Sequence, residues 1–292
     1  MAERGRVALV TGASGGIGGE TVKLLAADGW TVYAGARKAE DRAELERQGL
    51  KSVALDVTDD ASMRAAVDTV LSESGRIDLL VNNAGYGLYG PLEELDMDDL
   101  RRQFETNVFG LVRMTQLVLP VMRQRGGGRI INIGSVGGVI TTPMGSAYHA
   151  TKFALEAISD VLRVEVAPFG VDVVLVQPTG VRTGFFDKVL DSMPNSGPGS
   201  PYAGQRAAFA KAMAYVEHST GTLTPDAVAR VIVRAATDVH PRTRYKAGAS
   251  AYALIAARRL MPDRVWDAFM RRGLEMASRD KPGPEAATRP IS

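Results

Sequence analysis

Two side chains in the segment GSAYHATKFALEAI, Tyr148 and Lys152, stand four residues apart. On a helix that spacing places them on one face about one turn apart, so the Lys152 ammonium can lie near the Tyr148 phenol and favour its ionised form. An unperturbed tyrosine titrates near pH ~10, so such a neighbour brings proton transfer closer to neutral pH. The pair therefore predicts an acid–base device, although this spacing alone is more often an ordinary helix surface.

A glycine-rich turn, Thr11 to Gly18, follows a short apolar strand at Val7–Val10 and precedes a helical pattern. Glycines at 12, 16 and 18 allow a tight turn, close approach of the backbone to a pyrophosphate, and close packing of helix on strand. The free N–H groups of the helix N-terminus face the phosphates. Its place between strand and helix is the context that a dinucleotide-binding motif needs.

The glycine spacing is T-G-x-x-x-G-I-G, and here the chain resembles the non-extended branch of the short-chain dehydrogenase/reductase family. Further family motifs stand in order over about residues 5 to 245. They are Asn82-Asn83-Ala84-Gly85 after IDLLV, Asn107 in FETNVFG, Ser135 in INIGSVGG, and Tyr148-x-x-x-Lys152. Family members of this length, with a lid and an added C-terminal region, include enzymes resembling hydroxysteroid and retinol dehydrogenases, and the chain resembles these members.

The resemblance implies a role for each catalytic candidate. Tyr148 donates a proton to the carbonyl oxygen while NADPH delivers hydride, and Lys152 lowers the tyrosine pKa and holds the nicotinamide ribose. Ser135 positions the substrate oxygen, and Asn107 holds a water that links Lys152 to solvent. Taken singly, Ser135 would be a strand-end cap and Asn107 a polar helix residue.

The end of the second strand predicts the cofactor. An NAD enzyme places an acid there for the ribose 2′-hydroxyl. This chain has Ala36 at that position and then Arg37 and Lys38, which favours the 2′-phosphate of NADP(H). The predicted cofactor-binding residues are Gly12, Ser14, Gly16, Ile17, Gly18, Arg37, Lys38, Asp56, Val57, Asn83, Ala84, Gly85, Tyr148, Lys152, Pro178, Gly180, Val181 and Thr183.

One motif departs from the family pattern. In Gln177-Pro178-Thr179-Gly180-Val181-Arg182-Thr183, Thr179 replaces a usual glycine while Thr183 keeps its place by the nicotinamide carboxamide. The departure affects the backbone contact near Thr179, and Gly180 can absorb the turn.

Apolar runs alternate with helical patterns, which is typical of a parallel sheet covered on both faces. Strands are expected at 7–10, 31–35, 52–55, 77–81, 129–133, 171–177 and 244–247, and helices near 40–48, 60–73, 96–123, 148–167 and 225–237. The predicted fold is a doubly wound Rossmann sheet in one α/β domain over residues 1–248. A helical extension at 249–280 packs on that domain, and residues 281–292 form a disordered tail.

Substrate contacts are expected from apolar and aromatic side chains near the motifs. The predicted pocket residues are Val136, Ile140, Met144, Phe185, Phe186 and Tyr202, with Tyr86, Leu88, Tyr89 and Met193 nearby. A lid is expected at about 184–222, because its centre is rich in Pro, Gly and Ser. These features favour a hydrophobic ketone or alcohol. A 3-oxoacyl carrier-protein reductase and a non-catalytic NADP(H)-binding sensor or scaffold remain as alternatives.

Composition is consistent with a soluble cytoplasmic enzyme. The 292 residues have 23% charged and 45% hydrophobic residues, a net charge of +2 and no cysteine, which excludes disulfides and thiolate metal sites. Basic residues are scattered, so nucleic acid is not an expected partner, and no metal site is visible. The family resemblance implies a homodimer or homotetramer through the helices near 96–123 and 148–167.

The last helix carries apolar residues flanked by arginines. Val265, Trp266, Phe269, Met270 and Leu274 are expected to form one stripe. Core or subunit interface is favoured for this stripe over an anionic membrane.

Overall fold

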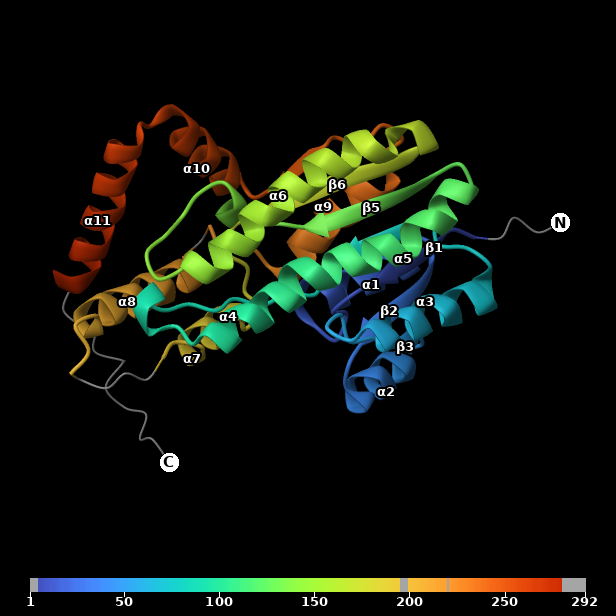
Figure 1. Cartoon of the computed structure of the whole chain (residues 1–292), viewed down its shortest axis with the longest axis horizontal. Coiled ribbons are helices and arrows are strands. Elements are labelled where there is room, and N and C mark those ends of the chain that lie inside the picture. The colour runs from blue at the N-terminus through green and yellow to red at the C-terminus, as the bar shows by residue number, and fades with distance from the viewer. Residues whose placement is uncertain (1–4, 195–198, 220, 280–292) are drawn as a thin grey trace.

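Seven parallel strands form one sheet in the computed structural model (Figure 1). The spatial order is β3-β2-β1-β4-β5-β6-β7, so the chain reverses direction across the sheet between β1 and β4. The strands are β1 (Val7–Val10), β2 (Thr31–Ala36), β3 (Lys51–Ala54), β4 (Leu79–Asn82), β5 (Gly128–Ile133), β6 (Val171–Pro178) and β7 (Arg244–Ala247). The predicted doubly wound sheet is confirmed, and ligands of such sheets bind at this switch point, outside the carboxyl ends of the strands.

The structure describes residues 5–194, 199–219 and 221–279, and the side chains of 186, 187 and 277–279 lie outside the described part. The helices are α1 (Gly16–Ala27), α2 (Ala39–Arg47), α3 (Asp60–Ser74), α4 (Met97–Phe104), α5 (Gly110–Gln124), α6 (Ser146–Val166), α7 (Phe185–Asp191), α8 (Ala203–His218), α9 (Pro225–Thr237), α10 (Ala249–Leu260) and α11 (Asp263–Arg279). Short 3₁₀ turns are η1 (Leu92–Glu94), η3 (Val136–Gly138) and η4 (Ala167–Phe169). The predicted tail at 281–292 lies outside the described residues.

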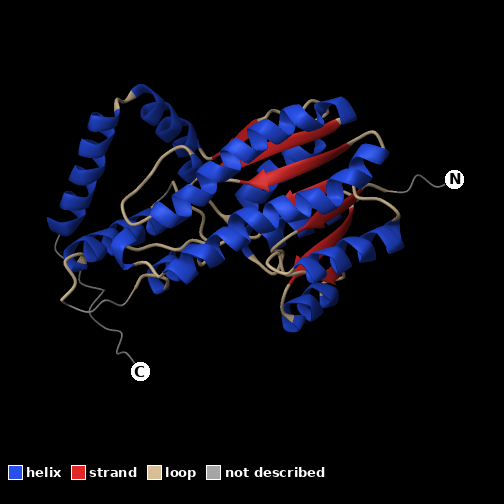
Figure 2. Ribbon diagram, in the orientation of Figure 1, coloured by secondary structure: helices blue, strands red, loops and turns tan. Residues whose placement is uncertain are grey.

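The two faces of the sheet carry separate apolar cores, and central strands such as β1 and β4 are buried on both sides. One core packs residues of α1, α2 and α9 on the sheet, including Leu25, Leu45 and Ile232. The other packs residues of α3, α5 and the end of α6 on the opposite face, including Val70 and Met114. Figure 2 shows the strands between these helical layers. This three-layer packing explains the near-continuous apolar runs of the strands.

The helix expected at 96–123 runs over 97–124, but it is not α-helical throughout. It divides into α4, a single π-helical turn η2 (Glu105–Phe109), and α5. A π turn adds a residue to the helical repeat and re-aims the side chains around it, and such turns occur frequently at functional sites. Here the turn contains Asn107, one of the catalytic candidates.

Candidate active site

The glycine turn between β1 and α1 has a backbone that other residues would not fit. Gly12 has a φ of 64°, and a Cβ at this residue would lie 2.8 Å from the Ala84 Cα. A Cβ on Gly18 would lie 2.4 Å from the Gly12 carbonyl oxygen. Ser14 is exposed beside them, and Ile17 packs on the core below. The turn therefore exposes backbone at the start of α1, which is the arrangement that holds a pyrophosphate.

Thr11 and Asn83 fasten this turn to the end of β4. The Thr11 hydroxyl accepts hydrogen bonds of 3.0 Å from the backbone N–H groups of Asn83 and Ala84. The Asn83 amide donates bonds of 2.9 Å to the Thr11 and Gly12 carbonyls. Asn83 thus braces the glycine turn with its side chain. The role of Thr11 was not predicted, although a Thr directly before the first glycine was a visible signal.

The opposite wall comes from the segment after β6. The Gly180 carbonyl accepts a 3.0 Å bond from the Leu223 N–H, and Val181 forms a parallel bridge with Leu223. Thr183 then reaches the glycine turn, with its methyl 3.4 Å from where a Gly16 Cβ would stand. Pro178, the last residue of β6, starts this wall. Residues on both walls of the predicted cofactor site are thus brought together.

Cations gather where β2 ends. Ala36 is buried, while Arg37 and Lys38 are exposed directly after it. Arg42, which was not predicted, donates to the Arg37 carbonyl at 2.7 Å and so lies at the same strand end. The Asp56 carboxylate comes within 4.0 Å of the Arg37 guanidinium. A carboxylate therefore lies beside these cations, although the strand end itself has none.

Asp56 and Val57 lie beyond β3 at the same edge of the sheet. The Asp56 carboxylate accepts bonds from the Thr58 backbone N–H and hydroxyl at 2.9 and 2.7 Å. Val57 is buried, and a Cβ on Gly110 would lie 2.5 Å from its carbonyl oxygen. Both residues are therefore fixed at the edge where the adenine contact is predicted.

Tyr148, Ser135 and Lys152 meet at the carboxyl end of β5. Ser135 follows the strand and its hydroxyl accepts a 2.9 Å bond from the Gly137 N–H, while its side chain is also hydrogen-bonded to Tyr148. Lys152 lies one turn along α6, with its Nζ 5.8 Å from the centre of the Tyr148 ring. Its ammonium donates a 2.8 Å bond to the Ile133 carbonyl at the end of β5. The helix and the strand end thus hold the three side chains together.

Burial dominates the titration of this group. It raises the pKa of Tyr148 above its ordinary value, and the hydrogen bond with Ser135 opposes that rise. Burial also lowers the pKa of Lys152 to about 8. The sequence predicts that Lys152 lowers the tyrosine pKa, whereas in this structure the net direction is upward. The reason is that the phenol lies under other rings while the ammonium is directed at the Ile133 carbonyl.

Asn107 links the π turn to the catalytic helix. Its side-chain oxygen accepts a 3.0 Å bond from the Tyr86 N–H, and its amide donates to the Tyr86 carbonyl at 2.8 Å and to the Thr151 hydroxyl at 3.1 Å. Thr151 in turn donates to the Tyr148 carbonyl at 2.7 Å. Asn107 therefore holds both α6 and the chain that follows Gly85.

Aromatic side chains cover Tyr148. Tyr89 stacks on its ring with centroids 5.5 Å apart, and Phe185 lies at 5.6 Å. Phe209 of α8 stacks on the far side of Tyr89 at 5.5 Å. Met144 joins the same cluster. The segment that sequence predicts as a lid thus places α7 and α8 over the tyrosine, and residues 195–198 and 220 of that segment lie outside the described part.

The predicted pocket residues divide into groups. Met144 and Phe185 pack with Tyr148, whereas Val136 and Ile140 pack with α10 and α11. The Tyr202 hydroxyl donates to the Glu93 carboxylate at 2.6 Å, away from that cluster. The side chain of Phe186 lies outside the described residues. In this structure, therefore, only part of the predicted set surrounds the tyrosine.

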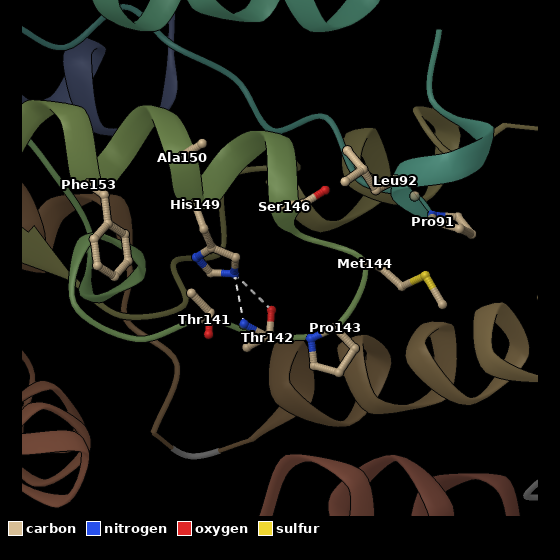
Figure 3. A pocket seen from close by; sticks show the side chains of 11 residues that line it. Pro91, Leu92, Thr141, Thr142, Pro143, Met144, Ser146, His149, Ala150 and Phe153 are labelled. Atoms are coloured by element: carbon tan, nitrogen blue, oxygen red, sulfur yellow. Dashed lines mark hydrogen bonds between the residues drawn. The ribbon is translucent and has the colours of Figure 1, made fainter. Parts of the chain in front are cut away.

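A pocket of about 500 Å³ opens beside the first turns of α6 (Figure 3). His149 forms part of its wall, where its Nε2 accepts a 3.0 Å bond from the Thr142 N–H and its Nδ1 bonds the Gly137 carbonyl at 2.9 Å. Burial lowers the pKa of His149. Ser135, Tyr148 and Lys152 do not line this pocket, so it lies on another face of α6 from the reaction site. Within the described residues, no three His, Asp or Glu side chains gather as a metal site.

A family model described as short chain dehydrogenase matches residues 6–193. The chain belongs to this family. A 3-ketodihydrosphingosine reductase of Bacteroides thetaiotaomicron is 43% identical over 62% of this chain and 66% of that protein. Human 17-beta-hydroxysteroid dehydrogenase type 1 is 41% identical over 64% of this chain and 60% of that protein. The second alignment thus leaves two fifths of the human enzyme unmatched.

Solved structures of short-chain dehydrogenases match more of the chain. One from Streptomyces avermitilis has a TM-score of 0.77 at 32% identity and covers 96% of this chain and all of that one. A closed form of serine dehydrogenase complexed with NADP⁺ has a TM-score of 0.73 at 29% identity, covering 84% and 95%. The chain is thus an oxidoreductase of the short-chain type, acting on CH–OH groups, with a nicotinamide cofactor.

Proposed function

We propose that this short-chain dehydrogenase is an NADP(H)-dependent enzyme that interconverts a hydrophobic ketone or aldehyde with its alcohol. The observation that carries the proposal is the Tyr148 phenol, hydrogen-bonded to Ser135 beneath apolar and aromatic side chains and one turn from a buried lysine. A phenol that keeps its proton up to high pH is an acid, and a serine beside it can fix the same carbonyl oxygen.

Each residue of the group then has a defined role in reduction. Tyr148 gives its hydroxyl proton to the carbonyl oxygen as that oxygen gains negative charge, and Ser135 donates a hydrogen bond to the same atom. The cationic Lys152 stabilises the phenolate that Tyr148 leaves behind and holds ribose hydroxyls. Asn107 keeps α6 in register with the chain after Gly85. The nicotinamide, when bound, supplies the hydride.

The residues present fit a dinucleotide phosphate. The glycine turn packs closely on neighbouring backbone at Gly12 and Gly18, and Gly12, Ser14 and Gly15 are exposed where a pyrophosphate would bind. Ala36 leaves no carboxylate at the strand end itself, and Arg37 and Lys38 are exposed beside it. The Asp56 carboxylate, 4.0 Å from Arg37, is a loose partner that a phosphate with greater charge can displace. A similar structure with NADP⁺ supports the same cofactor.

A hydrophobic substrate follows from what surrounds Tyr148. Tyr89, Phe185 and Phe209 supply rings, while Met144 and Val189 add aliphatic surface. Two relatives, a 3-ketodihydrosphingosine reductase and a hydroxysteroid dehydrogenase, have names that denote lipid-like substrates. We therefore assign a bulky apolar carbonyl compound to this site.

A panel of ketones tests the proposal through NADPH oxidation. The kcat/KM should rise with the apolar area of the substrate, at up to about 25 cal/mol per Å² buried in the transition state. Long-chain ketones and steroid ketones form one arm, and small polar sugars the other. A preference for acyl thioesters on a carrier protein would contradict the hydrophobic-ketone assignment but not the reductase activity. A lack of turnover with every carbonyl compound would contradict the proposal that the protein is an enzyme.

A further inference from the structure

Helix α11 has two different apolar faces. Its inner face carries Trp266, Met270 and Leu274, of which Trp266 is 2% exposed. Leu274 packs on the same cluster that covers Tyr148. The predicted stripe is thus not a single face, because Val265 and Phe269 are 51% and 54% exposed, although the Phe269 ring still lies 5.7 Å from that of Trp266.

The outer face of α11 is exposed. Val265, Phe269 and Met276 are 51%, 54% and 64% exposed, and they recur with Arg272 at the intervals of one helical face. Figure 1 shows α11 as the outermost helix at one end of the molecule, with α10 arching from the sheet towards it. Leu260, at the end of α10, is also exposed, at 83%.

Unpaired arginines accompany this face. Arg259, Arg264, Arg271 and Arg272 are exposed, and none of them has an ion pair within the part of the chain that the structure describes. Arg258, by contrast, pairs with Asp263 at 2.7 Å. Exposed apolar residues and unpaired arginines on one helix face are complementary to a surface that has negative charge outside and apolar material beneath it, as an anionic bilayer has.

Helices α5 and α6 also have exposed apolar residues, and the family resemblance implies that a second subunit packs on these two helices. Phe109 precedes α5, and Phe153, Val161 and Val164 lie on α6, at 54%, 43%, 58% and 74% exposed. The α11 surface is therefore additional to that one. Within the described residues, no helix is long and apolar enough to cross a membrane, so any contact of α11 with a bilayer would be peripheral.

We propose that the outer face of α11, made of Val265, Phe269, Arg272 and Met276 with Arg264 and Arg271 beside it, docks on an anionic phospholipid bilayer. The helix would lie in the plane of the interface, with Phe269 in the acyl boundary and the guanidinium groups at lipid phosphates. Leu274, on the inner face of α11, packs on the cluster over Tyr148. Docking would therefore place the catalytic site close to apolar molecules dissolved in the bilayer. That last consequence rests on the proposed function, but docking itself does not.

Flotation of the full chain with vesicles tests the docking. Vesicles of phosphatidylcholine mixed with phosphatidylglycerol should carry the protein upward, and vesicles of phosphatidylcholine alone should carry much less. Each arginine near an anionic surface contributes ~1 kcal/mol, so Arg272→Gln should weaken partition about fivefold. Phe269→Glu should weaken it by more than tenfold, since it removes the apolar anchor and adds a negative charge.

Matched controls lie elsewhere on the surface. Val239→Glu makes the same kind of change at a residue that is 83% exposed, and Arg125→Gln removes an exposed arginine at the end of α5. Both should float like the unmodified chain. All four variants alter exposed side chains, so their melting temperatures should agree, which separates lost docking from lost folding.

Three results would overturn the proposal. These are no flotation with anionic vesicles, equal losses in the variants and their controls, or a change of oligomeric state in Phe269→Glu by light scattering. The last would make the face a subunit interface. Flotation needs no turnover, so its outcome is independent of whether the ketone panel succeeds.

Discussion

The protonation state of Lys152 links the geometry of the site to its behaviour with pH. Its ammonium is buried, donates a hydrogen bond to the Ile133 carbonyl, and has a pKa lowered to about 8. The Tyr148 pKa is raised, so the tyrosine keeps its proton over the range in which the lysine loses its own. As the pH rises, Lys152 therefore loses its positive charge while Tyr148 still carries its proton.

Reduction should therefore fall as pH rises through about 8. Lys152 is cationic below that value and neutral above it, and only the cation stabilises the developing phenolate. The kcat/KM for NADPH reports groups of the free enzyme, so it should show this descending limb. A profile that stays flat well above that pH would show that the charge of Lys152 does not contribute.

We expect Arg37 to determine the preference for NADPH over NADH. Arg37→Ala should weaken NADPH binding by ~1.5 to 3 kcal/mol, the range for hydrogen bonds to charged groups, and leave NADH almost unchanged. Titration calorimetry with both cofactors measures this. Arg47→Ala, an exposed arginine on the next helix, is the matched control. Equal losses for both cofactors in Arg37→Ala would give Arg37 a role in the fold instead.

At the scale of elements, the glycine turn makes the sharpest steric prediction. In Gly18→Ala the new Cβ would stand 2.4 Å from the Gly12 oxygen and 2.5 Å from the Asn83 Nδ2, so the turn and its brace must shift. We expect a loss of roughly 1 to 3 kcal/mol in the free energy of unfolding. Thermal or urea unfolding of the protein without cofactor measures it.

Gly15→Ala provides the control within the same turn. Gly15 has a φ of 174°, which any residue adopts, and nothing lies within 4 Å of its added Cβ. Its stability should therefore stay within about 0.5 kcal/mol of the unmodified chain. If both substitutions destabilise alike, flexibility rather than close packing would explain the glycines.

Much of this architecture is visible in the sequence because strand and helix signals are local. The strand at 7–10 was predicted at its observed bounds, since a compact apolar run is followed at once by glycines. The π turn at Glu105–Phe109 was not predicted, because such a turn has no distinctive composition. The stacking of Tyr89 between Tyr148 and Phe209 joins residues far apart in sequence, and only the folded chain brings them together.

At the scale of the whole molecule, helices α5 and α6 leave apolar side chains uncovered. Phe153 and Val164 of α6 are 43% and 74% exposed. We predict a symmetric homodimer, or a tetramer built from it, through this surface. Phe153→Glu should shift the protein to a smaller species in light scattering at micromolar concentration, while Phe269→Glu should not. An unmodified chain that is monomeric under those conditions would contradict the assembly.

The central claim is that Tyr148 donates the proton in an NADPH-dependent reduction, and Tyr148→Phe tests it most directly. The substitution removes one hydroxyl and keeps the ring that stacks on Tyr89 and lies 5.6 Å from the Phe185 ring. With the best ketone of the panel, kcat/KM should fall by about 10² or more while NADPH affinity and melting temperature stay the same. Turnover close to that of the unmodified enzyme, with cofactor binding intact, would remove Tyr148 from the mechanism.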